Sequence, residues 1–180
     1  MELRELELPG VLMIKSQLHR DSRGSFVELL SPHLAKTLGV RSFPQVNVSN
    51  SLHNVFRGMH LQDEPHGQDK LIHCLTGSIS DFVLDVRPDS PTLGEHIKIE
   101  LRGGTGESLF IPSHYAHGFV SGADSTNVVY AVSKPRSQSH EISIDFRTTS
   151  VLKSVDAPSL ILSNRDRGAM SLTTYLQSLA

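Results

Sequence analysis

The chain has 180 residues, a length typical of one domain with a sizeable hydrophobic core. Its formal net charge is −2 with ten histidines counted as neutral, so no overall electrostatic field favours a nucleic-acid or membrane partner. One cysteine excludes an internal disulfide, and no apolar run approaches the roughly 20 residues that cross a bilayer.

These properties favour a small-molecule partner. The first residues, MELRELELPG, have neither the basic end nor the apolar run of a signal peptide. We therefore expect a cytoplasmic protein, with residues 1–180 forming a single domain.

The N-terminal part of the chain contains short elements separated by turn residues. The apolar run Val11–Lys15 and the stretch Phe26–Leu30 are each predicted to be strands, with HRDSRGS as the turn between them. Ser31 followed by Pro32 is typical of a helix start, and Gly39 is typical of a helix end. A helix of one to two turns is therefore expected over residues 32–38.

Polar and apolar residues alternate in the next two segments, which indicates strands with one polar face. In residues 44–50 the polar face consists of Gln45, Asn47 and Ser49. In Phe56–Gln62, His60 and Gln62 share a face, while Gly58 is a suitable place for a bulge that turns Arg57 towards it. Phe56–Gln62 and the strand that follows it, which begins at Lys70, are expected to line a polar cavity.

The remaining strands follow at nearly regular spacing, with Gly, Pro and Ser turns between them. They are predicted at 70–75, 78–86, 96–101, 108–111, 117–121, 126–133 and 142–146. Many short strands at this spacing favour an all-β sandwich or barrel. The tail, residues 156–180, ends in a pattern typical of a short helix that packs on the outside.

Several stretches taken together resemble a known family. RGMHLQ, DKLIHCLTGSISDFVLDVRPDSPTLG, LFIPSHYAHGF and VVY are similar, in order and spacing, to the nucleotide-sugar 3,5-epimerases typified by dTDP-4-dehydrorhamnose 3,5-epimerase. The resemblance runs from DSRGSF near residue 21 to SNRD near residue 163. It implies a cupin-type jelly-roll β-barrel with short flanking helices. It also implies a homodimeric isomerase that uses no cofactor.

The resemblance implies that the substrate is a nucleotide-diphosphate sugar, a nucleotide-linked 4-keto-6-deoxyhexose, inverted at C3, C5 or both through an enolate. Matching positions give His60 as general base, Asp166 as its carboxylate partner and Tyr130 as general acid. Residues matching the surroundings of the sugar are Lys70, Asp81 and His117. Those matching nucleotide contacts are Arg57, Gln45 and Asn47, together with Arg23, Phe26 and Glu28, which lie in a segment that crosses to the partner in the family.

These residue types suit the chemistry. A 4-keto group acidifies the protons at C3 and C5, and a histidine oriented by an aspartate can remove one near neutral pH. A lysine beside the resulting oxyanion stabilises it, and a phenol on the opposite ring face returns the proton. A cupin metal site needs two histidines one residue apart, whereas Gln62 occupies the second position, so we expect no metal.

Two other functions stay open on the sequence. A 3,4-ketoisomerase uses a similar barrel, although Gln62 stands where such enzymes tend to carry a second histidine. A non-catalytic nucleotide-sugar-binding cupin is suggested by Leu61 and Arg136, which occupy positions where the family usually carries tyrosine.

Other side chains have simpler structural interpretations. His73 and His96 are expected to be structural or exposed, and Cys74 is expected to be a small core residue. Asp85 with Arg87, and Arg23 with Glu28, are possible ion pairs.

Overall fold

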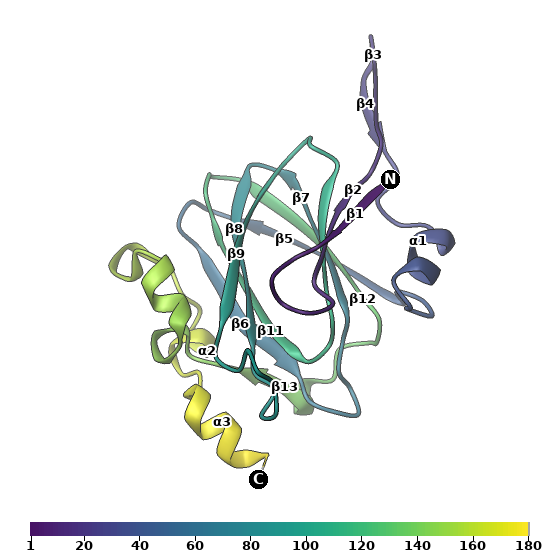
Figure 1. Ribbon diagram of the computed structural model, residues 1–180. Coiled ribbons are helices and arrows are strands. Elements are labelled where there is room, and N and C mark those ends of the chain that lie inside the picture. The colour runs from purple at the N-terminus through teal and green to yellow at the C-terminus, as the bar shows by residue number, and fades with distance from the viewer. Residues whose placement is uncertain (180) are drawn as a thin grey trace.

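Two antiparallel β-sheets packed face to face form the body of the protein, as seen in the computed structural model, which describes residues 1–179 (Figure 1). The six-stranded sheet has the order β1 (Glu2–Glu5), β2 (Leu12–Lys15), β10 (Glu107–Ile111), β7 (Lys70–Thr76), β12 (Thr126–Val132) and β5 (Gln45–Ser51). The five-stranded sheet has the order β13 (Glu141–Ser143), β6 (Phe56–Gln62), β11 (Tyr115–Ser121), β8 (Ser78–Asp85) and β9 (His96–Arg102). The predicted all-β jelly-roll architecture is confirmed, although the sheets stay open rather than closing into one continuous barrel.

The main core lies between the two sheets. Strand β8 shows why the sequence folds this way, because Ile79 and Val83 point into this core while Phe82 and Leu84 point to the opposite face of the same sheet. Both faces of β8 are therefore buried, and each fully buried side chain of this size contributes about 1.5–3 kcal/mol. The six-stranded sheet contributes Ile72, Cys74, Leu109, Ile111 and Val128 to the same core.

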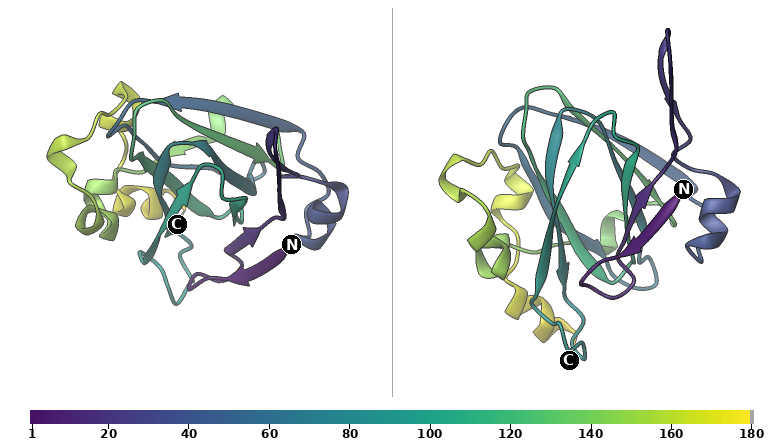
Figure 2. Two further views of the ribbon diagram at one scale, coloured as in Figure 1. Left: turned by 90° about the horizontal axis from the view of Figure 1, so that it is seen from above. Right: turned by 45° about the horizontal axis from the view of Figure 1, so that its top comes forward.

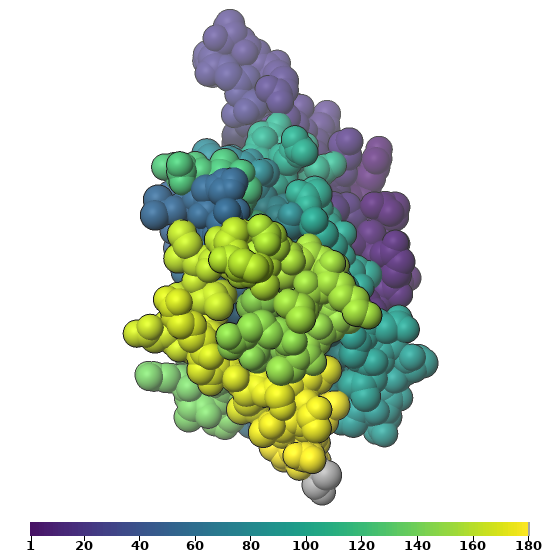
Figure 3. Space-filling model, turned by 90° about the vertical axis from the view of Figure 1, so that its left-hand side faces the viewer, coloured from purple at the N-terminus to yellow at the C-terminus, as the bar shows by residue number. Residues whose placement is uncertain are grey.

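The C-terminal segment covers the outer face of the five-stranded sheet (Figure 3). Phe146 packs against Phe56 of β6 with ring centroids 4.6 Å apart, and Tyr175 joins the same apolar cluster. The elements of this part of the chain are η1 (Gln138–His140), η2 (Phe146–Thr148), η3 (Ser150–Ser154), η4 (Ala157–Ser159), α2 (Asn164–Arg167) and α3 (Leu172–Ser178). The predicted short helix in the tail is therefore confirmed as α3, whereas α2 and the 3₁₀ turns were not predicted.

A hairpin of β3 (Leu18–Asp21) and β4 (Gly24–Val27) projects from the body of the protein (Figures 1 and 2). The turn predicted over HRDSRGS is confirmed only at Ser22 and Arg23, because residues 19–21 belong to β3 and residues 24–25 to β4. The strand predicted at 26–30 begins two residues later than β4 and extends beyond its end. The strands of the hairpin are almost wholly exposed, so no apolar alternation marks them in the sequence.

The predicted helix after the hairpin is confirmed as α1 (Pro32–Thr37). The Ser31 side chain accepts a hydrogen bond from the backbone N–H of Leu34, and Pro32 opens the helix. Gly39 follows with φ +71°, a conformation that glycine adopts without steric cost. No helix within residues 1–179 is long and apolar enough to span a membrane.

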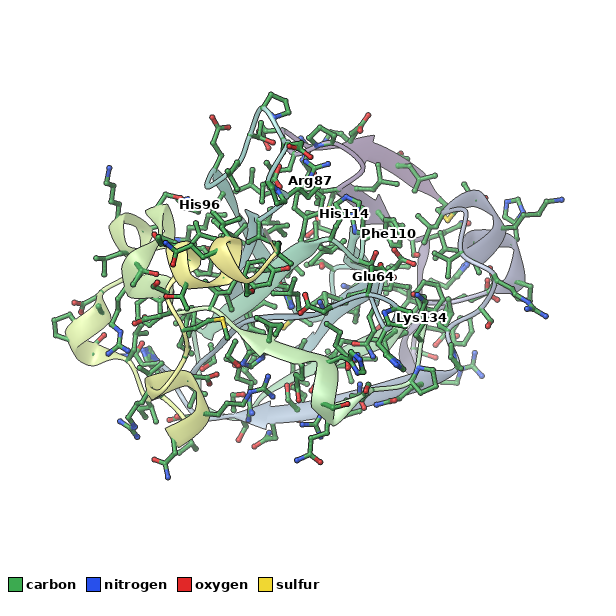
Figure 4. All side chains as sticks on the ribbon, turned by 90° about the horizontal axis from the view of Figure 1, so that it is seen from below. Glu64, Arg87, His96, Phe110, His114 and Lys134 are labelled. Carbon is green, nitrogen blue, oxygen red and sulfur yellow. The ribbon has the colours of Figure 1, made fainter. Side chains whose placement is uncertain are left out.

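The structural interpretations of the isolated side chains are mostly confirmed. Arg87 and Asp85 form an ion pair, and Cys74 is buried in the core. His96 hydrogen-bonds the side chains of Ser150 and Ser154, and Figure 4 shows it beside the C-terminal segment. The expected pair of Arg23 with Glu28 is wrong, since the Arg23 guanidinium binds Asp21 within the exposed hairpin.

Gly58 forms the predicted irregularity in β6. The pairing of β6 with β11 shifts register between His117 and Phe119, opposite this glycine. Gly58 has φ +136°, and a Cβ atom there would lie 2.4 Å from the Cα of Gly118. The close approach of the two strands therefore requires glycine at this position.

Replacing this glycine tests the requirement. Gly58→Ala combines a backbone strain of roughly 1–3 kcal/mol with a steric clash of similar size, so urea unfolding should show a loss of several kcal/mol. Gly104→Ala is the matched control, because Gly104 also has positive φ (+72°) but a Cβ there meets nothing within 4 Å. The control should lose only about 1–2 kcal/mol, and equal losses in both variants would contradict the interpretation.

Candidate active site

A cavity of about 560 Å³ opens between the two sheets, a size that suits a small ligand. Its walls come from β5, β6, β7, β11 and β12, together with the chain after β12 and the segment that leads into α2. Most of the residues expected from the sequence line it, namely Gln45, Asn47, Arg57, His60, Lys70, His117, Tyr130 and Asp166.

His60 and Asp166 form a close pair on one wall. The Nε2 atom of His60 lies 2.6 Å from Oδ1 of Asp166, and the two side chains are 30% and 4% exposed. Burial acts to raise the pKa of the Asp166 carboxyl, but hydrogen bonds from His60 and Ser163 outweigh it and hold this pKa below its ordinary value. The carboxylate is therefore ionised and fixes the orientation of the imidazole.

Helix α2 carries Asp166 to this position. Ser163 caps the helix by accepting a hydrogen bond from the backbone N–H of Asp166, and its hydroxyl donates to Oδ2 of the same residue. The serine hydroxyl thus satisfies a free N–H group at the start of the helix and holds the carboxylate, which explains why a serine precedes the aspartate by three residues. The short motif SNRD thus both starts the helix and holds its carboxylate.

Lys70 lies at the start of β7 with its ammonium group in the cavity wall, 3.4 Å from the backbone oxygen of His60. Burial lowers the pKa of Lys70 to about 8, although Asp69, Asp81 and Glu141 act in the opposite direction. Lys70 therefore keeps its positive charge near neutral pH and loses it in mildly alkaline solution.

Tyr130 and His60 belong to different sheets. Tyr130 lies on β12 of the six-stranded sheet and His60 on β6 of the five-stranded sheet, and both line the same cavity. The two side chains therefore line the cavity from different sheets.

His117 lines the cavity next to His60, its partner in the β6–β11 ladder. Asp81 lies behind it, with a carboxylate oxygen 3.0 Å from Nε2 of His117 and no exposed surface. Asp81 is therefore placed to orient His117 and does not itself line the cavity.

A different part of the cavity is marked by Arg57. Its guanidinium is held by the Ser51 hydroxyl and the backbone oxygen of Asn50, both on β5. Gln45 and Asn47, also on β5, are hydrogen-bonded to each other at 2.8 Å. The bulge at Gly58 is what allows Arg57 and His60 to line the same space.

Arg23, Phe26 and Glu28 lie outside this cavity. Arg23 and Phe26 belong to the projecting hairpin and Glu28 follows it, and all three are exposed, Phe26 by 68%. Within a single chain they therefore contribute nothing to the site.

The sequence did not identify all of the lining residues. Gln68, Arg136, Glu141 and Ser163 also line the cavity and were not predicted as site residues. Arg136 lies in the loop after β12 and Glu141 begins β13, so only the fold reveals that they meet. Within residues 1–179 no three His, Cys, Asp or Glu side chains are arranged to share a metal ion.

Comparison with known proteins decides the family. The family model described as dTDP-4-dehydrorhamnose 3,5-epimerase matches residues 5–174. The chain belongs to the dTDP-4-dehydrorhamnose 3,5-epimerase family. It is accordingly an isomerase, as the resemblance in the sequence implied.

Individual members of the epimerase family match over most of their length. The dTDP-4-dehydrorhamnose 3,5-epimerase of Mycobacterium tuberculosis is 34% identical over 176 residues, covering 95% of this chain and 87% of the relative. A Legionella pneumophila epimerase solved with dTDP-4-keto-L-rhamnose superimposes with a TM-score of 0.89 at 27% identity, covering 99% and 96% of the two chains. A 3′-monoepimerase from Streptomyces bikiniensis, solved with dTDP-quinovose, gives 0.85 at 27% identity, covering 96% and 89%.

The hydrogen-bonded pair of His60 and Asp166 in this epimerase site predicts a specific dependence of stability on pH. Because the pKa of Asp166 is lowered by folding, its contribution is fully present above the ordinary aspartate pKa of about 3.9 and is lost as pH falls through the depressed native value. Asp166→Asn should lower the free energy of unfolding by roughly 1.5–3 kcal/mol at neutral pH. The difference from the unaltered protein should shrink in strongly acidic solution.

Urea unfolding over a range of pH measures this effect. Asp89→Asn is the control, since Asp89 is exposed and its carboxylate makes no hydrogen bond within residues 1–179. If the difference in free energy of unfolding between Asp166→Asn and the unaltered protein stayed constant down to the lowest pH, the result would argue against an ionised Asp166.

Proposed function

We propose that this epimerase inverts C3, C5 or both of a nucleotide-linked 4-keto-6-deoxyhexose of the dTDP-4-dehydro-6-deoxyglucose type. The observation that carries the proposal is the placement of His60, with its buried Asp166 partner, and Tyr130 on opposite sheets around one cavity. Membership of the epimerase family supports the same reaction.

His60 is the general base of the proposed reaction. Its imidazole takes a proton from the carbon next to the 4-keto group, and the electron pair of the broken C–H bond becomes the enolate. Asp166 stabilises the imidazolium that forms and holds the ring in position. The carboxylate can do this because hydrogen bonds keep it ionised in a nearly buried place.

Lys70 stabilises the enolate oxygen. Its ammonium is already in place before the reaction and is shielded from water, and a preorganised charge of this kind contributes several kcal/mol to transition-state stabilisation. His117, oriented by Asp81, lines the same part of the cavity and is assigned to contacts with the sugar.

Tyr130 is the general acid. Its phenol donates a proton to the carbanionic carbon from the ring face opposite His60, which inverts the centre. The tyrosinate and the imidazolium then return to their starting forms by proton exchange with solvent. The balance of the reaction requires no oxidation, so the proposal needs no redox cofactor.

The nucleotide diphosphate is assigned to the part of the cavity near Arg57, Gln45 and Asn47. A guanidinium fixed by two acceptors is suited to bind phosphate oxygens. The amide groups of Gln45 and Asn47 offer further polar contacts on the same sheet.

We also propose that the chain acts as a homodimer of single domains covering residues 1–180. The projecting hairpin supports this, because Phe26 and Arg23 have no contact with their own cavity and are free to reach a partner. A cytoplasmic location is proposed as well, since the free thiol of Cys74 suits a reducing compartment.

Deuterium exchange tests the reaction directly. In D₂O the protein should introduce deuterium at C3, C5 or both of dTDP-4-keto-6-deoxyglucose, detected by NMR of the sugar. His60→Ala should lower the exchange rate by about 10²–10⁴ because the base is removed. Tyr130→Phe should retain exchange and lose inversion, because the base still acts but the opposite-face donor is missing.

Other outcomes separate the alternatives. Movement of the carbonyl to C3 would establish a ketoisomerase instead. Tight binding of the nucleotide sugar without any exchange would establish a non-catalytic binding protein. His114→Ala is a control, since this histidine lies outside the cavity and should leave exchange unchanged.

The pKa of Lys70 predicts how the activity changes on the alkaline side of the pH profile. Its pKa of about 8 means that the ammonium form disappears as pH rises through that value, so kcat/KM, which reports the free enzyme, should fall there. Lys70→Arg should react more slowly but lose this decline, because arginine stays protonated. Lys98→Arg, at an exposed position of β9, should keep it, and an unchanged decline in Lys70→Arg would refute the assignment.

A further inference from the structure

Part of the cavity wall is formed by two loops that lie far apart in the sequence. The first loop, residues 63–69, joins β6 to β7, and the second, residues 133–140, joins β12 to β13 and includes η1. Gln68 of the first loop and Arg136 of the second both line the cavity. How firmly the two loops hold together therefore sets how open this part of the cavity is.

Hydrogen bonds tie the second loop to the first loop and to the end of β6. The backbone N–H of Asp63 donates to the backbone oxygen of His140 at 2.9 Å. The backbone N–H of Ser137 donates to Oε1 of Gln62 at 2.6 Å. No residue of the second loop is buried, so it packs little apolar surface and depends on contacts of this kind for its position.

The imidazole rings of His66 and His140 stack between the two loops. Their centroids are 4.2 Å apart and their planes are inclined by 35°. The Nδ1 atom of His140 lies 2.8 Å from the hydroxyl oxygen of Ser137. Because a hydroxyl can donate to a neutral imidazole and accept from a charged one, this contact holds the ring in either charge state.

The charge of this histidine pair depends on pH. Histidine is the side chain that ordinarily changes charge between about pH 5 and pH 8, and both rings are only half-buried and within reach of solvent protons. Protonation of both rings places two positive charges on groups whose centres are 4.2 Å apart. Repulsion at that separation is appreciable even in a watery surrounding, whereas one neutral ring removes it.

The two loops, and the elements in contact with them, carry further charged or titratable groups. These are Asp63, Glu64 and Asp69 in the first loop, Lys134 and Arg136 in the second, Glu141 in β13, Arg165 in α2, Tyr175 in α3, and His114 in the turn after β10.

The carboxylates in this set already have partners. They are engaged by Tyr175 at Asp63, by Lys134 at Glu64 (Figure 4), by the backbone N–H of Ser113 at Asp69, and by Arg136 and Arg165 at Glu141. Within residues 1–179 no carboxylate forms an ion pair with either stacked ring, so none holds the two rings together once both are charged.

We propose that His66 and His140 form a pH-responsive clasp. At neutral pH the stacked rings carry at most one charge and hold the two loops together in the cavity wall. In mildly acidic solution both rings are protonated and repel each other, which separates the loops and opens this part of the cavity. The clasp goes beyond the proposed reaction, because it depends on the two loops and not on which sugar is bound.

Hydrogen exchange of backbone amides, followed by NMR, measures the opening of the clasp. The amides of Asp63 and Ser137 report it, because both donate hydrogen bonds that hold the second loop in place. Their protection factors, which correct for the pH dependence of intrinsic exchange, should fall by about 5-fold or more between about pH 7.5 and about pH 5. This is the effect of two unit charges about 4 Å apart even at the dielectric constant of water.

Three variants isolate the histidine pair. His140→Phe and His66→Phe each keep an aromatic ring for stacking and remove one charge, so in either variant the fall in protection should shrink to less than about 2-fold. Each variant decides the test on its own if the other does not fold. His33→Phe is the matched control, since it removes an exposed histidine from α1 instead and should keep the full fall.

The outcomes are distinct. Protection that stays constant with pH in the unaltered protein would overturn the clasp. A fall of the same size in His140→Phe and His66→Phe would also overturn it, because groups other than the pair would then open the loops. A fall confined to the unaltered protein and His33→Phe would support it. Deuterium uptake by the sugar is measured separately, so a failure of the proposed reaction would leave this result standing.

Discussion

The contact between His60 and Asp166 is the interaction on which the site depends. It joins residues 106 positions apart in the chain, and it requires a carboxylate to lie almost fully buried. Such a charge is tolerated only with hydrogen-bond partners. The packing of Phe146 against Phe56 and the capping of α2 by Ser163 together bring Asp166 to His60. The C-terminal segment is therefore part of the proposed catalytic site and not only a cover for the sheet.

Much of the fold was predictable, because buried strands leave an alternating pattern. Strand β6 was predicted with its correct bounds, and the bulge at Gly58 followed from a glycine between two polar residues. Helix α1 was predictable from its cap and its proline. The hairpin of β3 and β4 was not, because its strands are exposed and carry no apolar face. Strand β1, which is charged and exposed, was missed for the same reason.

The site was predictable where chemistry-bearing residues lie on alternating strands. His60, Lys70 and Tyr130 follow such patterns, and they meet in one cavity. Their roles came from resemblance to the epimerase family, since spacing alone does not reveal which side chains meet across two sheets. Asp81 could not be placed correctly from the sequence, because its position behind His117 depends on how β8 and β11 pair. The ion pair of Arg136 with Glu141 could not be predicted either, because no sequence pattern brings the loop after β12 to the start of β13.

A structure of the protein with bound dTDP-6-deoxyglucose tests the central claim most directly. The account predicts that the ring lies between the two sheets, with the imidazole of His60 next to the carbons that exchange on one face and the hydroxyl of Tyr130 on the other. A sugar bound outside this cavity, or one with both side chains on the same face of its ring, would contradict it.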